Sequence, residues 1–346
     1  MPARSPMPQR RGVGAVRLRT EAAAAWPTMG DWLRHRVPAA VDDHGLFERG
    51  DVVDGEGRPV RASDPCRPGT DVWVRRPLPD EPEVPGAIEV LFRDDRIVVV
   101  DKPPFLATTP RGRHVGQTVL ARLRDELGLP DLVPAHRLDR LTSGVLMLVA
   151  DPRWRGAYQR LFQDHAVRKT YQAVAPFRPT GSRSPGSAGP EAVGPPLDLP
   201  VVVRNRIVKE RGVWQARVVP GEPNAETLVE RMRILDEGAG PGPSPRRPGR
   251  AVYRLTPATG RTHQLRVHLS GLGIAIENDP LYPVVRDVAV DDFTHPLQLL
   301  AAELSFADPV DGRPRAFRSA RRLPFGLISP RAGPAEMAQI DADPIG

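Results

Sequence analysis

The sequence has almost no cysteine, little lysine and no long apolar run. Cys66 is the only cysteine among 346 residues, so an internal disulfide and a thiolate cage for a metal are both excluded. No stretch approaches the roughly 20 apolar residues that a membrane-spanning helix needs. We therefore expect a soluble, cytoplasmic protein of a reducing compartment, with no metal and no membrane contact.

Lysine is scarce although the chain is basic. Of the 49 basic residues, only Lys102, Lys169 and Lys209 are lysines. The 49 basic and 42 acidic residues give a net charge of +7. An arginine-rich surface favours a polyanionic partner such as nucleic acid. A genome rich in codons for Arg, Pro, Gly and Ala would give the same excess, so charge alone leaves both explanations open.

The N-terminal part has the composition of a basic tail followed by a small module. The first 20 residues contain five arginines, no acid and no apolar segment of the kind found in signal peptides. Their prolines oppose the amphipathic helix of a transit peptide, so we expect 1–27 to be a flexible tail. Residues 28–76 form the module, in which Thr28 caps a short helix and strands lie near Val52 and over 70–74. The Pro-rich stretch 77–87 is typical of a linker.

Residues 88–325 have the pattern of one large, sheet-rich domain. The runs 97–100 and 144–150 are nearly continuously apolar, as in strands that are covered on both faces. Apolar spacing predicts a helix between Trp154 and His165, and alternation predicts a strand over 169–174. The segments 181–196 and 238–249 are rich in Gly, Pro and Ser and are expected to be flexible, exposed loops, while 326–346 is expected to be a C-terminal tail.

One polar, charged loop precedes the apolar strand at 144. It has the sequence His136-Arg137-Leu138-Asp139-Arg140, followed by Thr142-Ser143-Gly144. Two arginines flank Asp139, and such neighbours hold a carboxylate ionised and ready to act as nucleophile or base. A surface ion pair explains the same spacing, so the residues alone leave the choice open.

A second unusual segment is Gly260-Arg261-Thr262-His263-Gln264-Leu265-Arg266-Val267-His268. We expect Thr262 to cap a short helix whose first turn, beside two arginines, suits a phosphate or an active-site carboxylate. The two histidines are five positions apart and share no helix face, so they are expected to be hydrogen-bonded structural residues rather than zinc ligands.

Together these segments resemble the RluA family of RNA pseudouridine synthases over roughly residues 88–325. Two of them, His136–Asp139 with Thr142–Gly144 and Gly260–His268, are similar to its long signatures. Shorter matches occur in order, at Val98–Pro103, Lys169–Tyr171, Ala225–Thr227 and Asp279–Tyr282. Residues 28–76 faintly resemble an alpha-L RNA-binding module.

The resemblance implies an α+β pseudouridine synthase fold, with a large mixed, mostly antiparallel sheet and a central RNA-binding cleft. It implies isomerisation of specific uridines to pseudouridine, with ribosomal RNA of the large subunit as first choice of substrate and tRNA as alternative. No cofactor is implied, since an isomerisation needs no external energy, and a monomer is expected.

The resemblance also assigns roles to particular residues. Asp139 is the expected catalytic carboxylate, Arg266 its ion-pair partner in preference to Arg261, and Tyr171 the aromatic residue that stacks on the flipped uracil. Arg137 would fill the gap that the base leaves, or bind a phosphate. The other expected RNA contacts are Arg140, Lys169, Arg261 and His263.

The sequence departs from the family pattern at two positions, and two other functions remain open. Asn278 replaces the glycine usual before Asp279, at a turn that favours positive φ, and Ala301 stands where many relatives have histidine. A non-catalytic RNA-binding assembly factor would keep the fold without the chemistry, and a nucleobase hydrolase would release free uracil.

Overall fold

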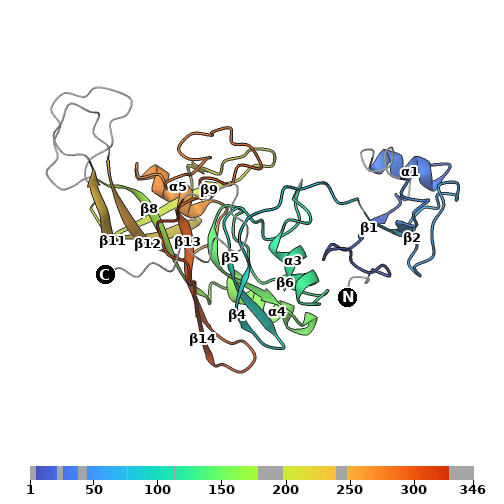
Figure 1. Cartoon of the computed structure of the whole chain (residues 1–346), viewed down its shortest axis with the longest axis horizontal. Coiled ribbons are helices and arrows are strands. Elements are labelled where there is room, and N and C mark those ends of the chain that lie inside the picture. Colours follow the sequence, from blue (N-terminus) through green and yellow to red (C-terminus); the bar gives the residue numbers. More distant parts are fainter. Residues whose placement is uncertain are drawn as a thin grey trace. The chain divides into compact units, whose positions relative to one another are not determined.

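The computed structural model describes residues 5–21, 26–37, 45–75, 77–112, 114–177, 198–238 and 248–326. The predicted loop 181–196 and, apart from Gly326, the predicted tail lie outside these ranges. The chain divides into two compact units, the first made of 1–82 with 109–130 and the second of 83–108 with 131–346 (Figure 1). No helix in the described ranges has the length and apolar character needed to cross a bilayer.

The first unit contains a short helix and a three-stranded sheet. The sheet has the order β1 (Val16–Arg19), β3 (Asp71–Val74), β2 (Val52–Val53), and all pairs are antiparallel. Helix α1 (Met29–Arg36) begins at the predicted cap, since the Thr28 hydroxyl accepts a hydrogen bond of 3.2 Å from the Asp31 amide. The fully buried Trp32 and Leu33 pack against the strands.

The boundaries of the first unit differ from those predicted. Residues 16–19 of the predicted tail form β1, because their alternation lets them pair with β3. Helix α3 (Val119–Glu126), expected in the large domain, belongs to the first unit. The predicted linker is also anchored there, since the Glu81 carboxylate accepts hydrogen bonds of 2.9, 2.7 and 3.1 Å from the amides of residues 115–117.

The second unit is built on one 11-stranded sheet. Its main order is β10-β9-β11-β12-β8-β13-β7-β5-β4, with β14 beside β13 and β6 beside β7. Among the strand pairs described, only β7 with β13 is parallel. The predicted large, mixed, mostly antiparallel sheet is therefore confirmed. The strands are β4 (Glu89–Arg93), β5 (Ile97–Lys102), β6 (Val133–Pro134), β7 (Ser143–Val149), β8 (Arg168–Phe177), β9 (Val201–Val208), β10 (Arg217–Val219), β11 (Ala225–Gly238), β12 (Pro248–Pro257), β13 (Leu299–Ala307) and β14 (Pro314–Arg318).

Two helices pack on this sheet (Figure 1). Helix α4 (Arg155–Gln163) follows the short 3-10 turn η1 (Pro152–Trp154), and its buried Tyr158 packs with apolar residues of β5, β7 and β13. Helix α5 (Gln264–Gly271) buries Leu265 and Leu269 against β8 and β12. The continuous burial of β5 and β7 agrees with the predicted strands covered on both faces.

Gly144, at the start of β7, allows the parallel pairing with β13. Its φ of +107° is disfavoured for other residues, and a Cβ there would lie 2.2 Å from the carbonyl oxygen of Ala301. The small residues Gly144 and Ala301 therefore bring β13 against the end of the loop that carries Asp139.

The predicted loop 238–249 is shorter than expected. Gly238 pairs with Pro248 at the ends of β11 and β12, and Gly249 pairs with Phe177 on β8. Strand pairing satisfies these backbone groups although their composition is typical of a loop. Residues 239–247 lie outside the described residues.

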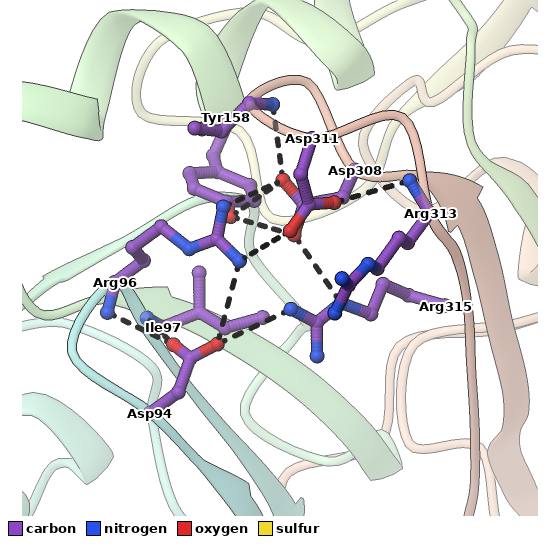
Figure 2. A network of polar contacts seen from close by, with 9 residues as sticks. Asp94, Arg96, Ile97, Tyr158, Asp308, Asp311, Arg313 and Arg315 are labelled. Atoms are coloured by element: carbon purple, nitrogen blue, oxygen red, sulfur yellow. Dashed lines mark hydrogen bonds and ion pairs between the residues drawn. The ribbon is translucent and has the colours of Figure 1, made fainter.

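A polar network joins α4 to two hairpins of the second unit (Figure 2). The hydroxyl of Tyr158 lies 3.1 and 3.0 Å from the two oxygens of the buried Asp308, and burial followed by this carboxylate raises the pKa of Tyr158. Arg96 and Arg315 approach Asp308 at 3.3 and 3.2 Å. Arg315 also reaches Asp94 at 3.4 Å. The network fixes the turn after β13 against the β4–β5 hairpin.

Candidate active site

The loop between β6 and β7 holds Asp139 half-exposed at the end of the sheet. Its turn is closed by a hydrogen bond of 3.1 Å from the Thr142 amide to the Asp139 carbonyl. The Thr108 hydroxyl donates to the Leu138 carbonyl at 2.8 Å and accepts from the Leu138 amide at 3.2 Å. The backbone on both sides of Asp139 is fixed, while its side chain stays 32% exposed.

Lys102 of β5 stabilises the loop that carries Asp139 by a hydrogen bond to its backbone. It is fully buried at the end of β5, and its Nζ donates to the carbonyls of Pro103, Leu106 and Arg140 at 3.0, 2.7 and 3.1 Å. Burial lowers the pKa of Lys102 well below its ordinary value, and the charge of Asp139 opposes this effect. Three acceptors match the three N–H groups of an ammonium ion, so the site suits the charged form.

Helix α5 begins one residue later than predicted. Its N-cap is His263 in the left-handed conformation, with φ of +58° and no side-chain cap, so the prediction of Thr262 as the cap was wrong. The Gln264 side chain takes over part of that role, because its Oε1 accepts from the Arg261 amide at 3.0 Å. Its Nε2 donates to the Glu226 carbonyl at 2.9 Å, which ties the helix start to β11.

Arg266 of α5 connects an exposed carboxylate with a buried one. Its Nη1 lies 3.7 Å from Asp139 Oδ2, while Nε and Nη2 donate to Asp279 at 2.7 and 2.6 Å. Arg266 is 2% exposed and Asp279 is fully buried. Burial opposes the charge of Arg266, but the hydrogen bonds and charge of Asp279 outweigh it and raise the pKa of Arg266. The guanidinium is a fixed cation beside Asp139.

His263 approaches the same carboxylate from the start of the helix. Its Nε2 lies 3.9 Å from Asp139 Oδ2, and its Nδ1 lies 3.0 Å from the Tyr282 hydroxyl. That hydroxyl donates to the Ala216 carbonyl at 2.9 Å and accepts from the Ala216 amide at 2.7 Å. The Tyr282 hydroxyl proton is donated to the Ala216 carbonyl, so it cannot also be donated to His263. The imidazole proton is therefore on Nδ1, which donates to the Tyr282 oxygen. Burial lowers the pKa of His263, with Asp139 opposing.

Tyr171 lies on β8 between Leu255 of β12 and Ala301 of β13. Burial, and then the negative charge of Asp139, raise the pKa of its hydroxyl. Tyr171 is therefore within electrostatic reach of Asp139 and keeps its proton at neutral pH.

The remaining predicted residues occupy different positions around the site. Arg137 is exposed, and Arg140 is half-buried with its Nη1 3.5 Å from the Phe105 carbonyl, where burial lowers its pKa. Arg261 is exposed and donates to the Asn224 carbonyl at 3.1 Å rather than to Asp139. Lys169 donates to the Thr259 carbonyl at 3.2 Å, and burial lowers its pKa.

Asp279, Tyr282 and Lys102 are site residues to which sequence reasoning gave no role. All three stood in motifs that were recognised, but the motifs did not indicate that they contact the Asp139 loop or Arg266. His268 is a hydrogen-bonded structural residue, as predicted, with its Nε2 3.0 Å from Asn205 Oδ1. Asn278 has φ of +61°, which agrees with the expected turn.

This arrangement holds one carboxylate, that of Asp139, at an accessible position 3.7 Å from a fixed cation. Within the described ranges, no group of three or more His, Cys, Asp or Glu side chains is placed to bind a metal. The second carboxylate, Asp279, is unavailable to a substrate, because Arg266 and the amides of Leu281 and Tyr282 occupy its oxygens.

Comparison with known proteins places this geometry in a family. Residues 96–271, from β5 to α5, match the family described as RNA pseudouridylate synthase. Pseudouridylate synthase RPUSD2 of Homo sapiens is 34% identical over 203 residues, which cover 59% of this chain and 32% of that protein. The chain thus spans about a third of that relative. Dual-specificity RNA pseudouridine synthase RluA of Vibrio parahaemolyticus is 31% identical over 243 residues, covering 70% of this chain and 81% of that protein.

A solved structure shares the fold. The structure of human RNA pseudouridylate synthase domain containing 1 aligns with a TM-score of 0.50 and 20% identity, covering 75% of this chain and 96% of that one. The matched region, which is a little over half of the chain, carries Asp139, Tyr171 and Arg266. The chain belongs to the RNA pseudouridylate synthase family, and among its relatives are proteins of the RluA type.

Proposed function

We propose that this protein is an RNA pseudouridine synthase, an isomerase that converts specific uridines to pseudouridine. In this reaction the bond between N1 and C1′ breaks and a bond between C5 and C1′ forms. The proton on C5 is lost and N1 gains one, so nothing is consumed. The observation that carries the proposal is the accessible carboxylate of Asp139, held 3.7 Å from the buried guanidinium of Arg266.

Asp139 is the catalytic carboxylate of the proposed reaction. It acts on the ribose, either by attack at C1′ or by removal of a proton, and both routes need the ionised form. Arg266 places a fixed positive charge 3.7 Å from Asp139 Oδ2. Lys102 and Thr108 fix the backbone around Asp139, so the carboxylate is oriented before the RNA binds.

The burial and hydrogen bonding of Asp279 favour isomerisation over hydrolysis. A retaining glycosidase uses a second carboxylic group to deliver water to the sugar. Asp279 is at the site, but it is fully buried and its oxygens accept hydrogen bonds from Arg266 and two amides. It cannot activate water, so the detached uracil can rejoin the ribose through C5.

Tyr171 is the proposed stacking partner of the uracil. Its place on β8 between Leu255 and Ala301, and its raised pKa, suit an aromatic ring that contacts the base as a neutral phenol. Removal of the C5 proton at the end of the reaction is a second role open to its hydroxyl.

The RNA contacts are proposed from charge and exposure. Arg137 is exposed two residues before Asp139 and suits the gap left by a flipped base or a phosphate. Arg140, Lys169, Arg261 and His263 are the other proposed contacts. We take residues 28–76 as an accessory RNA-binding module. Large-subunit ribosomal RNA is the first choice of substrate, and tRNA is the alternative. The protein is proposed to act in the cytoplasm as a monomer.

Product analysis tests the proposal. The purified chain is incubated, without metal or nucleotide, with total RNA from cells of the source organism that lack this protein, and the RNA is digested to nucleosides. We expect pseudouridine to increase and no free uracil to appear. Free uracil would indicate a hydrolase. Salt-sensitive RNA binding with neither product would indicate a non-catalytic assembly factor.

A further inference from the structure

Trp214 is the most exposed large apolar side chain among the described residues. It lies in the turn between β9 and β10 and is 75% exposed, beside Val213 at 45%. Single exposed valines are common, but tryptophan is on average a highly buried residue. The indole is therefore held in solvent at a cost in free energy, which is the usual property of a binding surface.

The β9–β10 hairpin is rigid on both sides of this turn. Residues 217–219 pair with 206–208, and the Asn224 side chain makes two hydrogen bonds, of 2.9 and 3.1 Å, with the backbone of Ile207. Ala216 is buried in a cluster with Ile207 and Tyr282. The backbone at the base of the turn is thus fixed, so little entropy is lost when a ligand contacts Trp214.

The same hairpin is attached to the active site. The Tyr282 hydroxyl bonds both backbone groups of Ala216, two residues after Trp214, and also contacts His263, whose Nε2 is 3.9 Å from Asp139. The Gln215 side chain donates to the Leu281 carbonyl, within the segment that carries Asp279. One continuous set of contacts connects the turn with the catalytic carboxylate.

The surroundings of Trp214 are basic. Between residues 204 and 222 there are five basic and two acidic side chains. Lys209 and Arg211 are exposed in the turn itself, and one of the two acids, Glu210, is paired with Arg217. The pKa of His263, lowered mainly by burial, is lowered further by the ammonium group of Lys209. An aromatic ring between cations complements a nucleic-acid strand, in which bases alternate with phosphates.

We propose that Trp214 stacks on an unpaired RNA base near the target uridine, while Lys209 and Arg211 bind the adjacent phosphates. This inference rests on the proposed function for its ligand, since it adds a second contact point to the same RNA. The stacked base belongs to a neighbouring nucleotide, because Tyr171 serves the target uracil. Stacking is tolerant of sequence, so Trp214 contributes affinity for single-stranded or loop RNA.

The test measures affinity of the full chain for two probes. One is a labelled single-stranded RNA of about 12 nucleotides, and the other is an abasic strand of the same length and charge. The variants are Trp214→Ala, Trp214→Leu and Trp214→Phe. The matched control is Val310→Ala, since Val310 is 38% exposed in the turn between β13 and β14.

We expect Trp214→Ala and Trp214→Leu to weaken binding of the RNA about 5- to 100-fold, as loss of one stacked base does. Trp214→Phe should stay within about threefold of wild type, because it keeps an aromatic face. Binding of the abasic strand should not change in any variant, and Val310→Ala should behave as wild type with both probes.

Four results would overturn the proposal. Unchanged RNA affinity in Trp214→Ala would show that the ring makes no contact. Wild-type affinity in Trp214→Leu would show an apolar contact without stacking. Equal weakening on the abasic strand would show an effect on charge or folding. If the wild-type chain self-associates through Trp214 without any change in RNA affinity, the occupant is a second copy and the proposal is wrong.

The outcome separates this inference from the proposed function. If the wild-type chain forms no pseudouridine but binds RNA through Trp214, the proposed enzymatic function is wrong and the proposed stacking site is supported. A chain that forms pseudouridine but does not depend on Trp214 for affinity would contradict the stacking site alone.

Discussion

Arg266 and Asp279 form a two-hydrogen-bond ion pair, at 2.7 and 2.6 Å, in which both side chains are almost completely buried. The remaining guanidinium nitrogen lies 3.7 Å from Asp139. A buried charge pair contributes little net stability compared with apolar packing, but it is strongly destabilising to break. The pair therefore serves to hold a cation beside an exposed carboxylate.

Replacement of Asp279 by asparagine should damage both stability and activity. The amide keeps the shape but leaves Arg266 without its buried counterion, at a cost of about 3–5 kcal/mol. Urea unfolding measures the stability, and the rate of pseudouridine formation at a temperature where the variant is folded measures the activity. Glu303→Gln is the matched control, since Glu303 pairs with Arg318 at 3.1 Å on the surface, and it should change stability by less than about 0.5 kcal/mol. Equal behaviour of the two variants would contradict the role of Asp279.

Lys102→Met should loosen the loop that carries Asp139. The methionine fills similar space but leaves the carbonyls of Pro103, Leu106 and Arg140 without a donor, which costs about 1–3 kcal/mol for each unsatisfied group. We expect the catalytic rate to fall while RNA affinity stays close to wild type, because Lys102 is buried and cannot contact RNA. Titration of RNA followed by single-turnover rates separates the two quantities. A loss of affinity with an unchanged rate would disagree with this assignment.

Part of this site was predictable from sequence and part was not. Thr28 as a helix cap and the buried strands depend on local pattern, and the structure agrees with both predictions. The proximity of Asp139 and Arg266 followed from the family resemblance, since the 126 positions between them carry no local signal.

The residues that were missed depend on long-range packing. Asp279 and Tyr282 acquire their function from contacts with α5 and the β9–β10 hairpin, and Lys102 from the carbonyl of Arg140. The N-terminal strand β1 was missed for the same reason, because its partner β3 is more than 50 residues away. The cap of α5 moved to His263 because Gln264 bonds the preceding backbone, which composition does not indicate.

Acid should destabilise the protein through buried histidines. Burial lowers the pKa of His268 to about 4 and that of His136 to about 3, from an ordinary value of 6.5. Below pH 6.5 the unfolded chain therefore binds protons that the folded chain does not bind. The two neutral, buried histidines make their full contribution to the free energy of unfolding above pH 6.5. This contribution is lost as the pH falls toward 4, by up to about 1.4 kcal/mol per pH unit for each histidine.

Urea unfolding at a series of pH values measures this slope. His136 Nε2 accepts a hydrogen bond of 3.1 Å from the Met147 amide, and glutamine can replace that acceptor without titrating. His136→Gln should therefore flatten the slope below pH 6.5. An identical slope in the variant and in wild type would exclude His136 as a source of the acid sensitivity.

Tritium release tests most directly whether the carboxylate of Asp139 makes pseudouridine. RNA labelled at C5 of uridine, from cells of the source organism that lack this protein, is incubated with the wild-type chain or with Asp139→Asn, without metal or nucleotide. We expect release by wild type, none above background by Asp139→Asn, and nearly equal RNA affinity of the two proteins. Equal release by both would contradict the account, because the reaction would then proceed without the carboxylate.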